Sequence, residues 1–346
     1  MKNTQTSTIF SRRQFIGNSG RIASAGALVG LTLPVVHGKS SDVTKLALVG
    51  CGGRGTGAAS NALSVSQANG PTKLVAMADV NRGKLDRSYN GLANKYEEKV
   101  DVPEERRFIG FNGHEKAMDV LDPGDVVIFT SPCAFRWVHF QYAIKRGLNV
   151  FMEKPVTPDG FSSRKMLELN EEAKKINLKV GVGLMCRHSQ ARRELKNRIE
   201  DGELGEILSM RAYRMQGAIA SCFSDKKPAN EDELAFQIKN FHSFLWLSGG
   251  SFSDFFIHNI DECCWMKGMW PIKCQAQGGR HFRGDKIDQN FDNYTVEYTF
   301  PDETKLYFHG RNMPGCYQDF SSQAHGTKGF ASISGPGGHR SQASIH

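Results

Sequence analysis

The chain has 346 residues, of which 39% are hydrophobic and 23% are charged. This composition excludes a disordered or membrane-embedded protein, and the length allows two domains. The formal net charge is +8, but five basic residues and no acidic residue lie in the first forty positions: Lys2, Arg12, Arg13, Arg21 and Lys39. Elsewhere no basic stripe alternates with aromatic residues, so we expect no nucleic-acid partner.

Residues 1–40 have the layout of an export signal. The sequence SRRQFIG at 11–17 precedes a run of small and apolar residues at 22–36, and Gly38 offers a cleavage position. The paired arginines resemble the twin-arginine motif, which directs folded proteins to the bacterial export machinery. The alternative is an uncleaved membrane anchor, but the apolar run is shorter than the ~20 residues that span a bilayer. We therefore expect a periplasmic or otherwise extracytoplasmic protein without a stable membrane span after processing.

The eight cysteines form no C-x-x-C pair and no regular framework. A chain that folds before export buries its cysteines as small hydrophobic residues, so we expect mostly free, buried thiols. Cys263 and Cys264 lie in an apolar helical stretch, where packing is the expected role. The histidines, including His242, show no zinc-like spacing, and we expect no metal site.

Residues 42–185 predict a dinucleotide-binding domain. An apolar run at 45–49 predicts a buried strand, and the glycines of G-x-G-x-x-G (Gly50, Gly52 and Gly55) follow it at the start of a predicted helix. Such glycines let the backbone approach a pyrophosphate at the amino terminus of a helix. The alternative is an ordinary glycine turn.

The second predicted strand ends at Asp79, 24 residues beyond the last glycine of the motif. A carboxylate at this position accepts hydrogen bonds from ribose hydroxyls and repels a 2′-phosphate, which favours NAD over NADP. Arg82 could instead pair with such a phosphate, so NADP stays possible. The alternative role for Asp79 is to cap the next helix.

Further apolar runs at 125–132 and 179–185 alternate with helical patterns at 135–147 and 162–175. This alternation predicts a doubly wound parallel sheet of the Rossmann type. Between them the strand NVFM ends in Glu153-Lys154-Pro155. Proline favours an extended conformation at Lys154, which holds its amine at the carboxyl end of the strand, where such sheets bind ligands.

From residue 186 the pattern changes to a predicted helix at 190–201 and to longer alternating runs. We expect a second, α+β domain at 186–346 with an open, mostly antiparallel sheet that serves substrate binding and oligomerisation. The expected strands are 207–217, 273–282, 293–300, 305–311 and 328–334, with a hairpin over 294–310. Residues 222–233 are expected to form an exposed loop.

Asp254 and His258 are four residues apart in an apolar helical stretch, a spacing that puts both side chains on one helix face. A carboxylate beside an imidazole fixes its tautomer and raises its basicity, as in general-base pairs. A capping aspartate and a core histidine would produce the same spacing, so both interpretations stay open.

The chain resembles the Gfo/Idh/MocA family of NAD(P)-dependent oxidoreductases. Three stretches carry the resemblance: VGCGGRG with ADV, the Glu153-Lys154-Pro155 triplet, and Gly249-Gly250 followed by Asp254, His258 and Asp261. The resemblance implies a catalytic set of Lys154, Asp254 and His258. The implied cofactor-binding residues are Gly50, Gly52, Gly53, Arg54, Gly55, Asp79, Arg82, Ser131, Pro132, His139, Glu153 and Lys154. Arg187 and His188 follow the last predicted strand of the sheet, where they either contact substrate hydroxyls or lie in a solvated loop.

The resemblance implies hydride transfer between a secondary alcohol of a sugar or cyclic polyol and a bound nicotinamide cofactor. In this interpretation His258 is the base, Asp254 orients it, and Lys154 stabilises the reacting oxygen. The alternatives are an NAD-dependent, redox-neutral glycoside hydrolase and a catalytically silent ligand-binding relative. A homo-oligomer is expected through the open sheet. Family members continue into a final helical stretch where this chain has a polar tail, so we expect a truncated or different carboxyl terminus.

Overall fold

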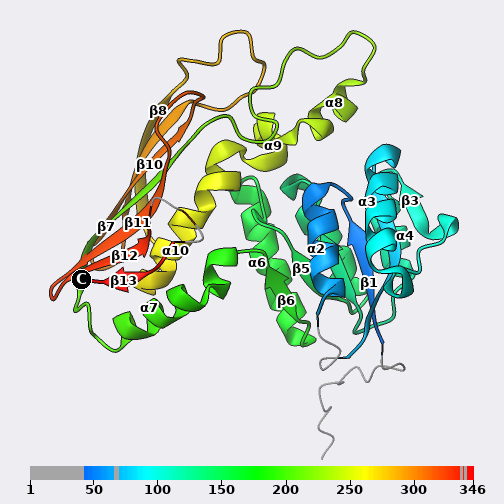
Figure 1. Ribbon diagram of the computed structural model, residues 1–346, viewed down its shortest axis with the longest axis horizontal. Helices are drawn as coiled ribbons and strands as arrows, with labels where there is room; N and C mark the ends of the chain where they lie inside the picture. The colour runs from blue at the N-terminus through cyan, green and yellow to red at the C-terminus, as the bar shows by residue number, and fades with distance from the viewer. Residues whose placement is uncertain (1–42, 66–69, 336–337, 339–340) are drawn as a thin grey trace, which may run out of the picture. The chain divides into compact units, whose positions relative to one another are not determined.

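The structure, a computed structural model, describes residues 43–65, 70–335, 338 and 341–346. The predicted export signal at 1–40 lies outside these residues. Within the described ranges, no helix has the length and apolar character needed to cross a membrane. Figure 1 shows the chain coloured from its first to its last residue.

The first sheet has six strands in the order β3-β2-β1-β4-β5-β6, and every neighbouring pair is parallel. This is the doubly wound order of a Rossmann sheet, and the order reverses between β1 and β4. The strands are β1 (Thr44–Val49), β2 (Thr72–Asp79), β3 (Arg107–Ile109), β4 (Val126–Phe129), β5 (Asn149–Met152) and β6 (Val180–Val182).

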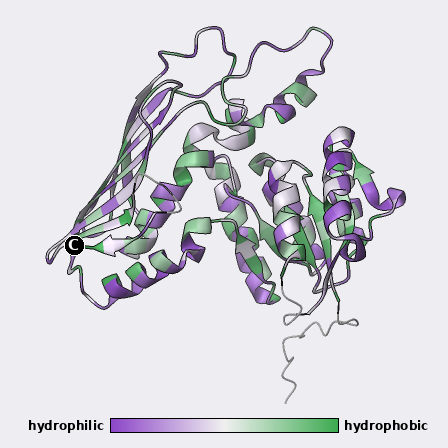
Figure 2. Cartoon of the chain, viewed as in Figure 1, coloured by the Kyte–Doolittle hydropathy of each residue, from purple (hydrophilic) through white to green (hydrophobic). Residues whose placement is uncertain are grey.

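Alternate residues of the parallel strands face two apolar layers. In β1, Ala47 and Val49 belong to one hydrophobic cluster, whereas Leu46 and Leu48 belong to another. Helices cover both layers, and Figure 2 shows the contrast between hydrophobic strands and the hydrophilic residues of the helices. These helices are α2 (Gly53–Leu63), α3 (Arg82–Lys95), α4 (Gly113–Asp119), α5 (Arg136–Lys145) and α6 (Gly160–Lys175).

The second sheet has seven strands in the order β13-β12-β11-β7-β10-β9-β8. Only β7 and β10 pair in parallel, and the other neighbouring pairs are antiparallel. The strands are β7 (Ile207–Gln216), β8 (Lys273–Gly279), β9 (Asn293–Thr299), β10 (Lys305–Asn312), β11 (Asp319–Gly326), β12 (Phe330–Ser334) and β13 (Ser344–Ile345). The two sheets confirm the predicted fold class.

Four helices accompany the second sheet: α7 (Gln190–Glu200), α8 (Glu233–Lys239), α9 (Leu245–Ser248) and α10 (Ile257–Lys267). Helix α10 packs against β7 and β11. A π-helical turn, Phe252–Phe256, runs directly into α10. The turn begins just after Gly249 and Gly250, which both adopt positive φ angles of 67° and 70° and permit the sharp change of direction that precedes it.

The structure differs from the sequence-based expectations at several elements. The strand predicted at 179–185 ends at Val182, and a 3₁₀ turn, Met185–His188, follows it. The sequence interpretation missed β3, β11 and β13. Strand β11 reads DFSSQAHG, and its small polar residues give little alternating hydrophobic signal. Its strand conformation comes instead from pairing with β7 and β12 in the sheet.

All eight cysteines are free thiols, and Cys51, Cys133, Cys186, Cys222, Cys263 and Cys264 are buried. This confirms the expectation of mostly free, buried thiols. Cys263 and Cys264 both belong to the hydrophobic cluster between α10 and the second sheet. Their role in the described structure is therefore packing.

Candidate functional site

The glycine-rich loop connects β1 to α2 at the carboxyl edge of the parallel sheet. Gly50 has a φ of +95°, and a Cβ atom there would lie 2.6 Å from the backbone nitrogen of Ser131. The loops after β1 and β4 can approach so closely only because residue 50 is glycine. A Cβ atom on Gly52 would meet nothing within 4 Å, so the outer side of this loop is open to a ligand.

Helix α2 begins at the next residue, Gly53, and its amino terminus has no side-chain cap. Its first turn contains no acidic residue. An uncapped amino terminus presents backbone N–H groups and a positive partial charge, which together favour a phosphate. Arg54 in this turn forms an ion pair with Glu153 across the edge of the sheet, with 3.2 Å between Nε and Oε1.

Asp79 lies at the end of β2, where both carboxylate oxygens accept backbone hydrogen bonds. Oδ2 accepts from the backbone N–H of Cys51 at 2.6 Å, and Oδ1 accepts from that of Asn81 at 2.8 Å. Asn81 caps α3, so Asp79 does not have the capping role of the alternative interpretation. The two bonds hold the carboxylate beside the glycine loop.

Arg82 does not line the cavity beside Asp79. Its guanidinium pairs with Asp86 and Glu104 at the exposed surface, while Lys84 lies at the cavity wall. The expectation that Arg82 could bind a 2′-phosphate therefore lacks support from the arrangement of its side chain. Lys84 lies two residues further along α3, on a different face of the helix.

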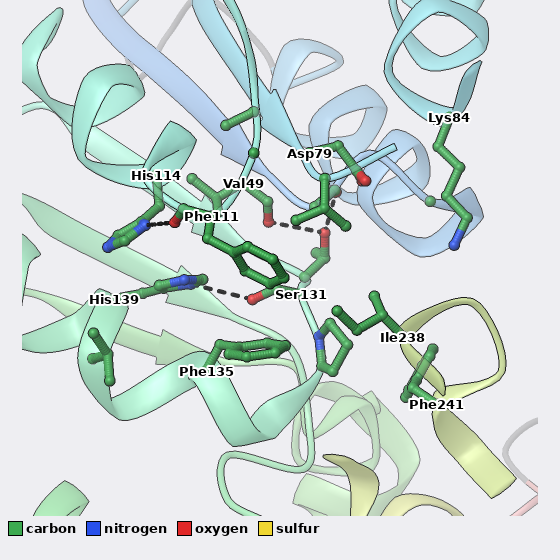
Figure 3. A pocket seen from close by; sticks show the side chains of 18 residues that line it. Val49, Asp79, Lys84, Phe111, His114, Ser131, Phe135, His139, Ile238 and Phe241 are labelled. Carbon is green, nitrogen blue, oxygen red and sulfur yellow. Dashed lines mark hydrogen bonds between the residues drawn. The ribbon is translucent and has the colours of Figure 1, made fainter. Parts of the chain in front are cut away.

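A cavity of about 240 Å³ opens beside the glycine loop and Asp79. Six of the predicted cofactor residues line it: Gly50, Gly52, Asp79, Ser131, Pro132 and His139. Figure 3 shows Phe111, Phe135 and the rings of His114 and His139 along one side, with Ile238 and Phe241 approaching from the second domain. Apart from His139, the sequence interpretation missed these apolar and aromatic walls, because their residues come from separate elements of the chain.

His139 has a packing role within this aromatic wall. Its ring stacks on that of His114 with centroids 4.2 Å apart, and its Nδ1 lies 3.2 Å from Oγ of Ser131 (Figure 3). Burial, with smaller contributions from His114 and Arg136, lowers the pKa of His139 well below its ordinary value. The imidazole is therefore neutral at neutral pH and gives the cavity a wall without charge.

Arg136, another residue that the sequence interpretation missed, holds two strand ends together. Its guanidinium is buried and donates hydrogen bonds to the backbone carbonyls of Ser131 and Glu153. Burial lowers the pKa of Arg136 to about 10. The loop after β4 and the loop after β5, which carries Lys154, are thus fixed to one another.

Lys154 and Asp254, two residues of the predicted catalytic set, are in direct contact. The Nζ atom of Lys154 donates to the backbone carbonyl of Asp254 at 2.6 Å and to its Oδ1 at 3.2 Å. The peptide bond between Lys154 and Pro155 is cis. Both side chains are largely buried, with exposed fractions of 18% and 7%. A lysine of the first domain and a carboxylate of the second therefore form one polar centre.

Asp254 also pairs with His242, to which the sequence interpretation gave no role in the site. His242 Nε2 lies 3.0 Å from Asp254 Oδ2. Burial raises the pKa of Asp254, but the hydrogen bond from His242 and the charge of Lys154 outweigh it and hold the pKa below its ordinary value. His242 lies twelve residues upstream of Asp254, and no spacing rule could have identified this pair. The pairing of Asp254 with His258 stays a prediction.

His258 is buried on α10, one turn beyond Asp254, with 5% of its surface exposed. Nearby, Arg187 forms a bidentate ion pair with Asp261, with Nε–Oδ2 and Nη2–Oδ1 distances of 2.9 and 2.8 Å. His188 approaches Arg193 rather than this pair, with 3.4 Å between Nδ1 and Nη2. The roles of His258 in catalysis and of Arg187 and His188 in substrate binding stay predictions.

A second cavity, of about 330 Å³, lies on the other side of the Lys154 loop. Its walls come from the loop after β5, from the π-helical turn and from α10, and they include Lys154, Pro158, Phe252 and Ile257. Among the described residues, no cluster of three or more His, Cys, Asp or Glu side chains could hold a metal ion.

Comparison with known proteins gives matches of two kinds. Residues 192–332 match the family model described as the GFO/IDH/MocA C-terminal domain. The chain is 27% identical over 128 residues to the inositol 2-dehydrogenase of Corynebacterium glutamicum. This aligned region covers 37% of this chain and 36% of that protein. It is 30% identical over 157 residues to the scyllo-inositol 2-dehydrogenase (NAD(+)) of Bacillus subtilis, covering 44% and 39%. The aligned regions thus span well under half of either relative.

The solved structures resemble the chain over a greater length. The scyllo-inositol dehydrogenase of Lactobacillus casei with bound NAD(H) and scyllo-inositol has a TM-score of 0.62 and 23% sequence identity. The match covers 83% of this chain and 75% of that one, and at this identity it establishes similarity of fold. The comparisons therefore show a match of residues 192–332 to the GFO/IDH/MocA C-terminal domain and a similarity of fold to a scyllo-inositol dehydrogenase structure.

Proposed function

We propose that the protein is an oxidoreductase that transfers a hydride between a secondary alcohol of a cyclic polyol or sugar and a bound nicotinamide dinucleotide. The observation that carries the proposal is the contact of Lys154 with Asp254. It lies where the first and second domains meet, at the edge of the sheet that also bears the open glycine loop. The similarity to inositol dehydrogenases supports a polyol as the substrate class.

The residues around the first cavity fit a dinucleotide. The open face of Gly52, the uncapped start of α2 and the fixed carboxylate of Asp79 suit a pyrophosphate and a ribose diol. Asp79 supports NAD over NADP, whose 2′-phosphate it would repel, although Lys84 at the same wall leaves NADP possible. When bound, the nicotinamide supplies the acceptor for the hydride.

Lys154 has one N–H group left for a substrate. An ammonium has three donors, and the backbone oxygen and Oδ1 of Asp254 engage two of them. We infer that the third donates to the reacting oxygen and stabilises the negative charge that grows there as its proton leaves. His258, buried on α10 near this centre, is the proposed acceptor of the hydroxyl proton.

The direct test is to purify the protein and add NAD with myo-inositol, scyllo-inositol and a set of aldoses and aryl glycosides. We expect absorbance at 340 nm to rise with at least one polyol or sugar. A single stoichiometric rise indicates a cofactor that stays bound and needs a second substrate for its reoxidation. Catalytic release of the aglycone without net reduction supports the glycoside hydrolase, and NADH binding without either reaction supports a silent relative; both outcomes overturn the proposal.

We further propose that the protein is exported and forms a homo-oligomer. Export rests on the twin-arginine pattern at 11–17. The oligomer is supported by β8, whose first six residues are exposed, and by Trp270 and Ile272 beside it, which are 67% and 68% exposed. Fractionation of cells that produce the full chain and light scattering of the purified protein test the two proposals separately. A protein retained in the cytoplasm, or a monomer at micromolar concentration, contradicts them.

A further inference from the structure

His242 lies at the end of a hydrogen-bonded series that reaches Lys154. Its Nε2 is 3.0 Å from Asp254 Oδ2, and the other oxygen of that carboxylate accepts from Lys154 Nζ at 3.2 Å. Its Nδ1 is 2.9 Å from Oγ of Ser221. The series therefore runs from Ser221 through His242 and Asp254 to the amine, and it joins three segments that are distant in sequence.

The hydroxyl of Ser221 can select which nitrogen of His242 carries the proton. The Ser221 oxygen accepts the backbone N–H of His242 at 3.3 Å, so its own hydrogen can be donated to Nδ1. A neutral imidazole whose Nδ1 accepts must carry its hydrogen on Nε2. That hydrogen points at Asp254, and the carboxylate receives a donor from His242 as well as from Lys154.

The backbone of His242 is held firmly enough to define this geometry. Asn290 donates its side-chain amide to the carbonyl of His242 at 2.9 Å. The next residue, Ser243, is fully buried, and its hydroxyl donates to the Ser221 carbonyl and lies 2.8 Å from Oγ of Ser224. Two separate loops thus fix the turn, Phe241–Ser243, that carries the imidazole.

The imidazole also lies between the first cavity and the carboxylate. Its ring packs on Phe241 with centroids 3.8 Å apart and on Phe255 at 5.4 Å. Phe241 is one of the residues that line the cavity proposed for the dinucleotide (Figure 3). Phe241, which lines the cavity, is therefore in contact with His242, which binds Asp254.

We propose that His242 is a positioning residue for the reaction. It fixes the rotamer and the ionised state of Asp254, and Asp254 in turn directs the free N–H of Lys154 toward the substrate oxygen. This inference rests on the proposed dehydrogenase function, and it assigns to His242 the orienting contact that the sequence pattern assigns to the Asp254–His258 pair.

The test compares two substitutions at the same position. His242→Phe removes the donor and keeps an aromatic ring, and it should lower kcat about 10- to 100-fold because a hydrogen bond to a charged group is lost. KM for the polyol and the affinity for NADH should change less than about threefold, since neither ligand contacts His242 in this proposal. His242→Gln restores an N–H donor and should recover kcat to within about fivefold of the wild type.

The pH profile separates positioning from loss of structure. Loss of the His242 donor raises the pKa of Asp254, so the fall of kcat on the acidic side should begin at a higher pH in His242→Phe and return toward the wild-type pH in His242→Gln. The charged and titratable groups that act on Asp254 are otherwise unchanged; these are Lys154, Arg136, Cys133 and Cys222. His309→Phe is the matched control, because His309 stacks on Tyr213 at 5.6 Å on β10 and should leave kcat and the profile unchanged.

Two further measurements make the outcome decisive. Should His242→Phe fail to fold, Ser221→Ala, which removes only the hydroxyl at Nδ1, should shift the acidic limb in the same direction by a smaller amount. Nitrogen-15 NMR at pH 8.5 should find the hydrogen of His242 on Nε2 whether or not a substrate is known. A hydrogen on Nδ1, or wild-type kcat and acidic limb in both variants, overturns the inference; absence of any turnover by the wild type overturns only the proposed function.

Discussion

The cores of the two sheets are built from different kinds of residue. The core around the parallel sheet is almost wholly apolar, and two of its few buried polar residues, Arg136 and His139, lie at the edge of the candidate site. The core of the second domain buries whole charged groups. Arg192 and Glu262 form an ion pair with no exposure of either side chain, and Arg283 pairs with Asp288 and Asp292 in the same manner.

The difference shows how each region is specified. An apolar strand finds its place through a local pattern, and many sequences satisfy that pattern. A buried ion pair is tolerated only when both partners meet with correct geometry, because each charge alone in the interior is strongly unfavourable. The second domain therefore depends on particular pairs of distant residues, and the same dependence brings Asp254, His242 and Lys154 into contact.

The largest effect should come from breaking such a pair. Arg192→Met leaves the buried carboxylate of Glu262 without its cationic partner, and it should lower the free energy of unfolding by about 3–5 kcal/mol. Urea denaturation measures the change. The double variant Arg192→Met/Glu262→Leu should recover most of the loss, and Arg198→Ala in an exposed pair with Glu203 should change nothing measurable. A small change in the single variant would contradict the contrast between the two cores.

Lys154→Ala tests the contact that joins the two regions. It removes the donor to the reacting oxygen, and kcat should fall about 10²- to 10³-fold, the usual effect of losing one such donor. NADH fluorescence should report an affinity within about threefold of the wild type, since the glycine loop is untouched. Lys165→Ala, which breaks a surface contact with Glu168 on α6, is the control. Turnover that survives Lys154→Ala removes this residue from the catalytic set.

Two glycines of one loop should respond differently. Gly50→Ala forces a Cβ atom to within 2.6 Å of the Ser131 nitrogen at a φ of +95°, and it should reduce stability by about 1–3 kcal/mol. Gly52→Ala adds a methyl group in open space, so it should leave the melting temperature unchanged while weakening NADH binding. Equal effects of the two substitutions on the melting temperature, or full NADH affinity in Gly52→Ala, would mean that the loop is not a pyrophosphate cradle.

The smallest expected change concerns the choice between NAD and NADP. Asp79→Asn keeps a polar group near Cys51 and Asn81 but removes the negative charge, and it should weaken NADH binding about 10-fold, the loss of one charged hydrogen bond. The ratio of NADPH to NADH affinity should rise. Arg82→Ala should alter neither affinity, because its guanidinium pairs with Asp86 and Glu104. Titration of the wild type, Asp79→Asn and Arg82→Ala with NADH and NADPH measures these affinities. A specific loss of NADPH binding in Arg82→Ala would show that Arg82 belongs to the cofactor site.

Much of the dinucleotide domain could be predicted because its signals are local. The glycines at 50–55 mark a strand, turn and helix that are contiguous in sequence, and Asp79 follows on the next strand. The same reasoning placed Lys154 at the carboxyl end of β5. It did not identify His242 as a partner of Asp254, and it gave no account of Phe111 or Arg136, because their contacts come from segments that meet only after the sheet has formed.

The sequence by itself determined the alternation of strands and helices, the glycine loop, and the residue types that the candidate site needs. These follow from hydrophobic periodicity and from the backbone freedom of glycine, which act over a few neighbouring residues. Only the tertiary structure decided that Asp254 binds Lys154 and His242, and that Arg192 meets Glu262. Such contacts join residues that lie 12 to 100 positions apart, and the close packing and low dielectric of the interior, rather than any local preference, decide which of them form.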